Sequence, residues 1–405
     1  MIALDLSRLL SRAGRATPTG IDRVELAYAE HLIASGQRCC YAAVTPDGRL
    51  APLPKRIAEG FVREIGAAWR GPPDPKEQDR RVRRIARHAR IALLAGSERR
   101  LFGALRDAPG GSVYLLVSHH HLERKRLIAR LKRRGRTRFV CLIHDLIPVE
   151  FPEYAKPGQA ANHLRRIETA VALADALIVN SAVTGAALQD HLDRAGRTPP
   201  VLTAPFGADL PAAAQSGVPP IGRPYFVYVG TIEARKNHLL LLNLWRQLSR
   251  DLGERTPVLV LVGQRGWEIE NVVDMLDRCP ALRGTVIELN AAPDAALVPL
   301  LRGARGLLLP SFAEGFGFPV IEALQLGVPV LCSDIAALRE IGGAVPEFLD
   351  PLDGPGWRAA ILDYAAPKSP RRAAQLARLA GWSPPRWDGY FAAVDRFIAE
   401  VASAR

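Results

Sequence analysis

The stretch GLLLPSFAEGFGFPVIEALQLGVPVLCSD, residues 306–334, decides how this chain folds. It begins with a short apolar run typical of a buried strand and continues through a glycine-containing turn. It then shows a helical pattern before a second apolar run. The first turn of a helix has backbone N–H groups without partners and favours negative charge. The stretch therefore predicts a strand, an anion-binding turn and a helix within an α/β domain.

Two glutamates, Glu314 and Glu322, stand on either side of this turn. Carboxylates repel phosphate, so they are better suited to bonding hydroxyl groups. Gly315 and Gly317 let the backbone approach a ligand closely, and Pro319 suits the first position of a helix. Hydroxyl-binding carboxylates beside an anion-binding turn predict a nucleotide sugar as the ligand. The alternative is that Glu322 is only a first-turn glutamate favoured by the helix dipole and that Glu314 is a solvated loop residue.

Apolar runs alternate with helical patterns along most of the chain. In the second half they cover residues 225–230, 258–263, 286–291, 306–311 and 329–334. Continuous apolar strands separated by helices indicate a parallel sheet that is covered on both faces. The first half repeats the pattern less regularly, at residues 1–7, 39–45, 112–120, 138–145, 176–181 and 201–207. A chain of 405 residues is long enough for two such α/β domains.

The stretch between residues 209 and 224 is rich in proline, glycine and alanine, which makes it the best candidate for a linker. We therefore expect an N-terminal domain over residues 1–212 and a C-terminal domain over residues 213–385. A final helix over residues 386–405 is expected to pack back on the first domain. Ligands of parallel sheets bind outside the carboxyl ends of the strands, so residues that directly follow strands are the candidates for a site.

Two cations follow the first strand of the second half. Arg235 and Lys236 lie in GTIEARKN, residues 230–237. Arginine can bind a phosphate by two parallel bonds, and lysine acts on it as a point charge. The alternative is a pair of solvated residues at the start of a helix. The segment TGIDRV, residues 19–24, fits either a second glycine-assisted anion turn with Asp22 as a helix cap or an ordinary turn.

Histidines follow two strands of the first half. His144 ends the run FVCLIHD, where a residue facing a substrate would lie, although a lone histidine is more often structural. His119, His120 and His121 follow another strand, but consecutive strand residues point to opposite faces and do not easily bind one metal. The chain also contains no Asp-x-Asp pair. We therefore expect no metal cofactor, and charge on a leaving diphosphate would be met by cations and helix dipoles.

The whole net charge of +13 lies in residues 1–210, where 34 Lys and Arg outnumber 21 Asp and Glu. Basic amphipathic patterns at residues 80–94 and 124–138 predict an anionic membrane surface as a partner, with a solvated helix face as the alternative. Nucleic acid is disfavoured because these patterns contain few aromatic residues. The sequence has no apolar run of roughly 18 residues or more, and from its charged first residues we expect no signal peptide.

Five cysteines include no CxxC pair, and Cys141 and Cys332 lie in apolar runs typical of buried thiols. We therefore expect a cytoplasmic protein on the inner face of the plasma membrane.

Residues 225–355 resemble the retaining glycosyltransferases of family 4, which have the GT-B architecture of two Rossmann-like parallel-sheet domains facing a cleft. The resemblance rests on YVGTIEARKNH (228–238), LVGQRGW (261–267), residues 300–343 with Glu314 and Glu322, and DPLD (350–353). TGIDRVELAYAEHL (19–32) and VCLIHDLIPVEFPEY (140–154) extend it more loosely to bacterial mannosyl- and rhamnosyltransferases of surface-polysaccharide assembly.

The resemblance implies roles for individual residues. Glu314 would bond the hydroxyls of the transferred sugar, and His144 would contact that sugar from the other domain. Glu322 would hold the ribose hydroxyls, and Arg235 and Lys236 would bind the diphosphate. The remaining donor-binding residues would be Gly20 at the diphosphate, backbone N–H groups of Gly315, Phe316, Gly317 and Phe318 near sugar and phosphate, and Leu289 and Asn290 beside the base.

Many relatives carry arginine directly after the glycine of the first strand in the C-terminal domain, but this chain has Thr231 there. Arg235 would then take over part of that charge.

By this resemblance, the enzyme would move a hexose from a nucleotide diphosphate sugar to a lipid-linked or growing polysaccharide acceptor. Mannose from GDP-mannose is favoured by analogy. In such transferases the leaving phosphate helps to deprotonate the acceptor hydroxyl on the same face of the sugar, so a side-chain nucleophile is not needed. Two alternatives remain open: a nucleotide-sugar epimerase on the same fold, and a non-enzymatic protein that binds membrane or nucleic acid through the basic half.

Overall fold

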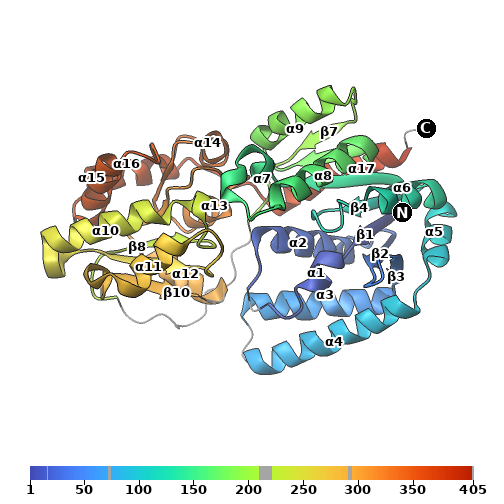
Figure 1. The fold of residues 1–405 in the computed structure, drawn as a ribbon, viewed down its shortest axis with the longest axis horizontal. Coiled ribbons are helices and arrows are strands. Elements are labelled where there is room, and N and C mark those ends of the chain that lie inside the picture. Colours follow the sequence, from blue (N-terminus) through green and yellow to red (C-terminus); the bar gives the residue numbers. More distant parts are fainter. Residues whose placement is uncertain (16, 72–73, 209–220, 291–293, 404–405) are drawn as a thin grey trace. The chain divides into compact units, whose positions relative to one another are not determined.

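A computed structural model describes residues 1–15, 17–71, 74–208, 221–290 and 294–403 (Figure 1). The chain divides into two compact units. Unit 1 holds Met1–Val149, Gly158–Gly207 and Trp387–Arg405, and unit 2 holds Glu150–Pro157 and Ala208–Arg386. Most of the linker predicted between residues 209 and 224 lies outside the described residues.

Unit 1 is built on a seven-stranded sheet with the strand order β3-β2-β1-β4-β5-β6-β7. All neighbours are parallel except β3, which runs antiparallel to β2. The strands are β1 (Ile2–Asp5), β2 (Cys39–Val44), β3 (Leu50–Leu53), β4 (Val113–Leu116), β5 (Arg138–Ile143), β6 (Ala176–Val179) and β7 (Val201–Thr203). Most central strand residues are buried on both faces, because helices cover the sheet on each side.

Unit 2 contains a six-stranded parallel sheet with the order β10-β9-β8-β11-β12-β13. In its centre Leu307 of β11 pairs with Val227 of β8. The strands are β8 (Tyr225–Val229), β9 (Val258–Val262), β10 (Val286–Leu289), β11 (Gly306–Leu309), β12 (Val330–Ser333) and β13 (Glu347–Leu349). Two parallel sheets covered by helices confirm the predicted fold class.

The sequence patterns missed two strands, β3 and β13. Both are short and lie at the edges of their sheets. β3 reads LAPL and contains Pro52, which an edge strand tolerates because its N–H side needs no partner. β13 reads EFL and has no continuous apolar run to mark it. Short edge strands of this kind leave little signal in the sequence.

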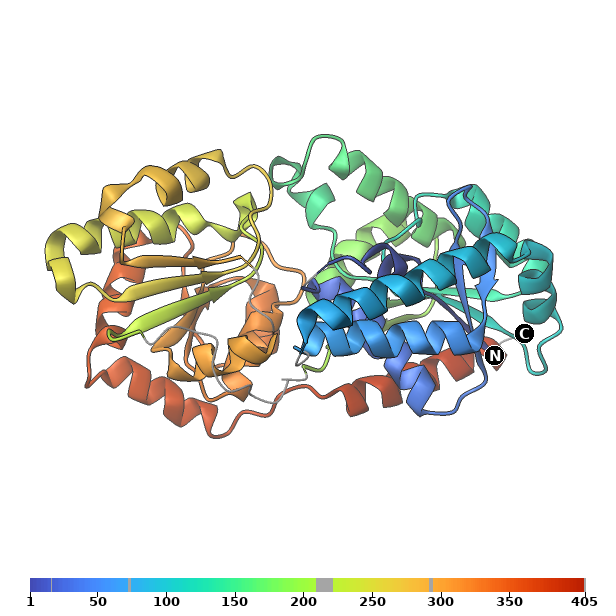
Figure 2. The ribbon, with the colours of Figure 1, turned by 90° about the horizontal axis from the view of Figure 1, so that it is seen from below.

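The helices of unit 1 follow the strands as crossovers or pack outside them. Figure 2 shows α3 and α4 running side by side. The helices are α1 (Ser7–Ser11), α2 (Gly20–Ala34), α3 (Lys55–Arg70), α4 (Pro75–Ala95), α5 (Glu98–Arg106), α6 (Lys125–Gly135), α7 (Ile147–Glu150), α8 (Gln159–Leu173), α9 (Ala182–Arg194) and α17 (Trp387–Ser403).

The helices of unit 2 connect its parallel strands in the same way. They are α10 (His238–Leu252), α11 (Glu270–Arg278), α12 (Asp294–Gly303), α13 (Phe318–Gln325), α14 (Ala336–Gly342), α15 (Gly354–Ala365) and α16 (Pro370–Leu379). Short 3-10 turns are η1 (Pro152–Tyr154), η2 (Ala234–Lys236), η3 (Gly253–Arg255) and η4 (Pro280–Leu282).

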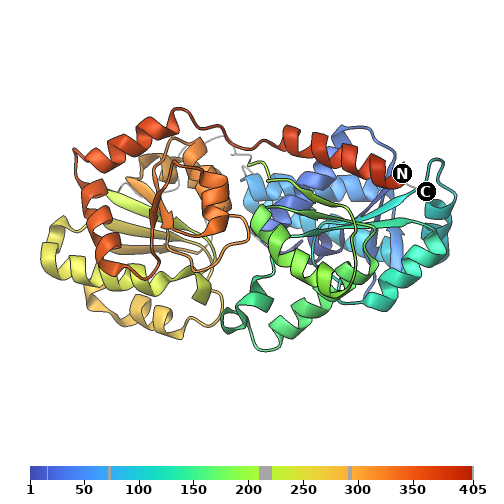
Figure 3. The same ribbon diagram turned by 90° about the horizontal axis from the view of Figure 1, so that it is seen from above.

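The C-terminal helix α17 packs within unit 1. Figure 3 shows it in red against the unit 1 sheet, where it contacts β4 and β5. The hydroxyls of Tyr390 and Tyr28 are hydrogen-bonded at 2.6 Å, and Phe391 stacks on His31 with ring centroids 4.0 Å apart. His31 Nε2 also lies 2.9 Å from Asp395 Oδ2. An aromatic and polar contact between α2 and α17 therefore fastens the end of the chain to unit 1.

Each sheet has a point where the strand order reverses. In unit 2 the chain winds from β8 to β9 and β10 in one direction and from β11 to β12 and β13 in the other. In unit 1 the reversal falls between β1 and β4. Open α/β sheets bind ligands at such reversals, outside the carboxyl ends of the strands. The residues after β1, β4, β8 and β11 therefore have the most favourable positions for a site.

The burial of two cysteines and the length of the helices concern the predicted location of the protein in the cell. Cys141 and Cys332 are both fully buried free thiols, as their apolar runs predicted. Burial raises the pKa of each thiol. Among the described residues, no helix has both the length and the apolar content that crossing a bilayer would require.

Candidate functional site

The segments after β8 and β11 meet at the strand-order reversal of unit 2. Arg235 and Lys236 lie in η2, in the loop that follows β8 and Gly230. The backbone N–H of Phe312, after β11, donates to the carbonyl of Arg235 at 2.8 Å. A Cβ on Gly263, after β9, would lie 1.9 Å from the carbonyl oxygen of Gly230, so only glycine fits there. Close backbone packing of this kind fixes the two cations at the carboxyl ends of the central strands.

Glu314 binds both of these cations. Its carboxylate accepts from Arg235 Nη1 at 2.9 Å, from Lys236 Nζ, and from Ser311 Oγ at 2.7 Å. Arg235 Nη1 also donates to the carbonyl of Ala313 at 2.7 Å, and Arg235 Nη2 pairs with Glu233 Oε1 at 2.6 Å. The side chains of Glu314 and Lys236 are 6% and 9% exposed, and that of Arg235 is 21% exposed. The structure therefore brings the three predicted residues into one nearly buried cluster.

The positive charges of this cluster stabilise the ionised form of Glu314. Burial alone would raise the pKa of Glu314, but Lys236 and Arg235 outweigh it and lower that pKa to about 2. Burial and the neighbouring Arg235 lower the pKa of Lys236, while Glu314 acts in the opposite direction. Glu314 is thus ionised at neutral pH and holds both cations in place. In this structure its partners are protein groups, and its predicted bond to a sugar hydroxyl stays a prediction.

The turn between Glu314 and α13 needs its glycine. Gly317 has a φ of 102°, and a Cβ there would lie 2.6 Å from Leu338 Cδ2. The rings of Phe316 and Phe318 lie 5.0 Å apart across this position. Glu322 is on the second turn of α13 and is 4% exposed. The predicted strand, turn and helix are therefore confirmed, and the roles of Gly315 to Phe318 and of Glu322 at a ligand stay predictions.

The residues predicted beside the base lie further along the sheet. Leu289 ends β10, which is separated from β8 by β9. Asn290 is exposed, and its amide nitrogen donates to Glu288 Oε1 at 2.8 Å and to the carbonyl of Gly263 at 3.2 Å. These two residues therefore lie at the end of the edge strand of the sheet, whereas the Glu314 cluster follows its central strands β8 and β11. Thr231 follows Gly230 in the loop beside β9, where Ile232 pairs with Arg265.

His144 follows β5 in unit 1 and is 5% exposed. Its Nε2 donates to the carbonyl of Val117 at 2.8 Å, and its backbone N–H donates to His119 Nε2 at 3.2 Å. Burial lowers the pKa of His144 to about 4 against the effects of the Val117 bond and Asp145, and Arg8 lowers it further. The imidazole is therefore neutral, with its proton on Nε2 and its lone pair on Nδ1.

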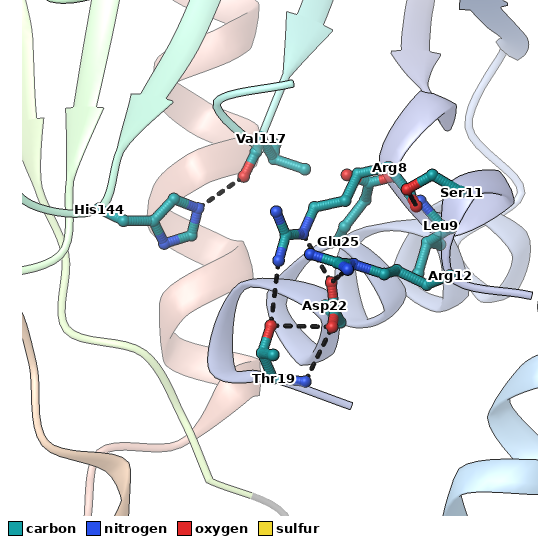
Figure 4. Close-up of polar contacts among 9 residues, drawn as sticks. All are labelled: Arg8, Leu9, Ser11, Arg12, Thr19, Asp22, Glu25, Val117 and His144. Atoms are coloured by element: carbon teal, nitrogen blue, oxygen red, sulfur yellow. Dashed lines mark hydrogen bonds and ion pairs between the residues drawn. The ribbon is translucent and has the colours of Figure 1, made fainter. Parts of the chain in front are cut away.

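Gly20 is the first residue of α2, directly after Thr19. Asp22 is 1% exposed and accepts from the backbone N–H and the hydroxyl of Thr19, both at 2.8 Å. The residue before the helix is therefore Thr19, and Asp22 reaches back to it rather than capping the helix itself. Asp22 also accepts from Arg8 Nε at 2.6 Å, and Arg12 Nε lies 3.4 Å away (Figure 4).

Arg8 is a candidate that the sequence patterns did not reveal. It lies on α1, directly after β1, where the strand order of unit 1 reverses. Its guanidinium is 13% exposed and bonds to Asp22 and to Thr19 Oγ1 at the start of α2 (Figure 4). Two guanidinium groups share the single carboxylate of Asp22, which leaves positive charge beside Gly20. The sequence signal for Arg8 is a cationic residue in the first helical turn after the first strand.

Glu25 lies behind this cluster on α2 and is fully buried. Burial and the nearby Asp5 raise its pKa to about 8, although Glu25 accepts from the backbone N–H of Leu9 at 3.0 Å. Because the folded pKa is raised above 4.5, the stabilising contribution of Glu25 is complete below pH 4.5 and is lost as the pH rises to about 8.

Glu25→Gln should therefore flatten the decline of Tm over this pH range. A neutral glutamine keeps the bond from Leu9 and has no charge to bury. Thermal melts of wild type and variant between pH 4.5 and about 8 measure the effect. An equal decline in the two proteins would contradict the buried, neutral state of Glu25.

Within each unit the structure gathers part of the predicted set. Arg235, Lys236 and Glu314 form one cluster in unit 2. His144 and Gly20 belong to unit 1, where His144 follows β5 and Gly20 begins α2.

Comparison with known proteins relates most of unit 2 to one protein family. Residues 212–344 match the family described as Glycosyl transferases group 1. The O-antigen chain mannosyltransferase B of Escherichia coli is 37% identical over 164 residues, which are 40% of this chain and 42% of that protein. The serotype-specific mannosyltransferase WbdA of Escherichia coli is 30% identical over 220 residues, 50% of this chain and 27% of that protein. The chain thus spans less than half the length of these curated relatives.

The whole chain shares its fold with solved structures. An Escherichia coli trehalose-6-phosphate protein bound with UDP-2-fluoro glucose has a TM-score of 0.63 at 13% identity, over 100% of this chain and 99% of that one. This likeness shows the GT-B fold alone. The family match covers residues that include the cation cluster at the strand-order reversal of unit 2. Residues 212–344 thus form a segment that is similar to the glycosyl transferases group 1 family.

Proposed function

We propose that this protein is a retaining glycosyltransferase that moves a hexosyl residue from a nucleotide diphosphate sugar to a saccharide acceptor. GDP-mannose is the favoured donor, because the relatives named above are mannosyltransferases. The acceptor is a lipid-linked or growing polysaccharide, in keeping with the O-antigen chain that one relative's name specifies.

One observation carries this proposal: Glu314 holds Arg235 and Lys236 together at the strand-order reversal of unit 2. The start of α13 and the turn before it lie directly after Glu314 in the chain. A diphosphate at this place meets two fixed cations and the positive end of a helix dipole. Such preorganised charge stabilises a leaving phosphate because nothing has to reorient during the reaction.

The proposed chemistry needs no side-chain nucleophile. The bond between C1 of the sugar and the phosphate oxygen breaks, and the acceptor oxygen bonds to C1 on the same face. The proton of the acceptor hydroxyl passes to the leaving phosphate, so the charges balance. Arg235 and Lys236 stabilise the negative charge that develops on the diphosphate, and Glu314 keeps them in position.

His144 would contribute from unit 1. Its Nε2 proton is engaged by the carbonyl of Val117, so Nδ1 would accept a hydrogen bond from a sugar hydroxyl. Its low pKa keeps it neutral, which suits binding and orientation rather than a transfer of charge. The start of α2 at Gly20 and the guanidinium of Arg8 on α1 would add positive potential near the diphosphate.

We expect transfer to proceed without a divalent metal, because Arg235 and Lys236 supply the positive charge at the diphosphate. Incubation with EDTA followed by removal of free ions should leave the rate of hexose transfer unchanged. The measurement is product formation by mass spectrometry, with and without added Mg²⁺ or Mn²⁺. Complete loss of transfer after EDTA, restored by either ion, would show that this expectation is wrong.

Product analysis separates transfer from the alternatives. The protein is incubated with GDP-mannose alone and with GDP-mannose plus a polyprenyl-linked saccharide. Transfer predicts GDP and an extended saccharide only when the acceptor is present. Conversion of GDP-mannose into another nucleotide sugar without an acceptor would favour an epimerase. Absence of any reaction or binding with a panel of nucleotide sugars would favour the non-enzymatic reading.

A further inference from the structure

Helix α4 presents an unusual outer face. Its inner face packs on α3 through buried residues, and Figure 1 shows α4 as the outermost helix on its side of unit 1. The buried positions are Val82, Ala86, Ala89 and Leu93. At 100° per residue these four positions lie within one narrow stripe. The opposite side of α4 therefore faces away from the protein.

Two large aliphatic side chains stand on that outer side. Ile91 is 57% exposed and Leu94 is 55% exposed. Only three other large apolar side chains are exposed among the described residues, namely Val183, Leu239 and Leu352. Single exposed apolar residues need no explanation, but Ile91 and Leu94 are three positions apart and therefore neighbours on the helix surface. Ile91 lies opposite the centre of the buried stripe.

Arginines continue the same stripe toward the start of α4. Arg84 and Arg87 precede Ile91 by seven and four positions, so they lie on its side of the helix. Both are exposed, and neither has an ion pair or side-chain hydrogen bond within the part of the chain that the structure describes. Arg80 also lies on this side, and its guanidinium pairs with Glu77. The outer stripe, defined as Arg84, Arg87, Ile91 and Leu94, thus combines free positive charge with exposed aliphatic surface.

We propose that the outer stripe of α4 docks the protein on an anionic lipid bilayer. Ile91 and Leu94 enter the boundary between headgroups and acyl chains, and Arg84 and Arg87 bind the lipid phosphates. A helix with cations beside aliphatic side chains is suited to lie in the plane of a membrane surface. The inference deepens the proposed function, on which it rests, because a lipid-linked acceptor is found at such a surface.

Nucleic acid is a poorer occupant of this surface. Binding of single strands uses aromatic side chains as stacking platforms, whereas the outer stripe offers only aliphatic ones. An exposed isoleucine and leucine gain nothing from a phosphate backbone. They do gain from an acyl layer, because burial of apolar surface stabilises by about 25 cal/mol per Å². The aliphatic pair is thus the part of the stripe that distinguishes a bilayer from other anionic partners.

Cosedimentation with vesicles tests the proposal. The full chain is mixed with vesicles of phosphatidylglycerol and phosphatidylethanolamine, and with neutral phosphatidylcholine vesicles for comparison. Wild type should bind only the anionic vesicles, and more weakly at high salt. Arg84→Gln with Arg87→Gln should weaken binding about 30-fold, from roughly 1 kcal/mol for each cation at an anionic surface. Ile91→Gln with Leu94→Gln should weaken it about tenfold or more.

Matched controls keep the test specific. Arg246→Gln with Arg250→Gln removes the same charge from exposed positions on α10, and Leu352→Gln removes an exposed aliphatic residue from unit 2. Both controls should bind vesicles like wild type. Equal weakening by the α10 pair, or wild-type binding by the Ile91 and Leu94 variant, would overturn the proposal. If short RNA displaced the wild-type protein from the vesicles, the surface would bind nucleic acid and the proposal would be overturned.

A second readout separates this inference from the proposed function. All variants on α4 should transfer hexose to a short, water-soluble acceptor at the wild-type rate, because the stripe does not touch the reacting groups. Their rates with a polyprenyl-linked acceptor in anionic vesicles should fall in parallel with vesicle binding. Failure of wild type with both acceptors would contradict the proposed function, whereas normal vesicle binding would still support the docking surface.

Discussion

Glu314→Ala is expected to abolish measurable hexose transfer, with kcat falling by about 10²–10³-fold or more. The carboxylate holds Lys236 and Arg235 in position, and without it the two cations repel each other in a nearly buried cluster. Removal of one partner from a buried ion pair typically destabilises a protein by about 3–5 kcal/mol. The free energy of unfolding should therefore fall as well.

Donor binding should be mostly retained in Glu314→Ala, because the diphosphate supplies the negative charge that the variant lacks. For the same reason, GDP should raise the Tm of this variant more than it raises that of wild type. Glu314→Gln, which can still accept from Ser311, should have the same defect in kcat with less loss of stability. The exposed Glu254 provides a control, since Glu254→Ala should leave both quantities unchanged. Wild-type turnover in Glu314→Ala would refute the assignment of this cluster.

Lys236→Met should reduce hexose transfer by a similar factor, because it weakens the binding of the donor diphosphate. Methionine fills the space of the lysine stem without its charge, and Glu314 keeps its bonds to Arg235 and Ser311. The fold should be preserved, while KM for the donor rises and kcat/KM falls about 100-fold or more. Steady-state kinetics with GDP-mannose measure both parameters, and a thermal melt checks the fold.

The exposed Lys368 gives the matched control for charge, because Lys368→Met removes the same charge elsewhere in unit 2. It should behave like wild type. If Lys236→Met kept its affinity for the donor and its kcat/KM, the diphosphate would have to bind away from η2.

Much of the fold could be predicted because its strands are short and fully apolar. Runs such as VLVLV at residues 258–262 leave no polar face, which only a sheet covered on both sides explains. The helix of residues 318–325 could be placed from its proline and glycine signals. Edge strands β3 and β13 have no such run and escaped prediction.

The internal geometry of the site could not be predicted in the same way. Glu314 and Lys236 are 78 residues apart, and their contact depends on β8 and β11 being neighbours in the sheet. From the sequence, the Glu314 carboxylate is expected either at a ligand or in solvent, whereas the structure pairs it with both cations. Arg8 escaped notice because α1 has only five residues, too few for a periodic pattern, and because its partner Asp22 lies on another helix.

Isothermal titration of the donor addresses the central proposition of this account, that Arg235 and Lys236 clasp the diphosphate of a nucleotide sugar. GDP-mannose titrated into the wild-type protein should give one saturable site, GDP alone should retain most of the affinity, and the double variant Arg235→Gln, Lys236→Met should give no binding heat. Equal affinity of wild type and double variant, or no heat with any nucleotide sugar tried, would contradict it.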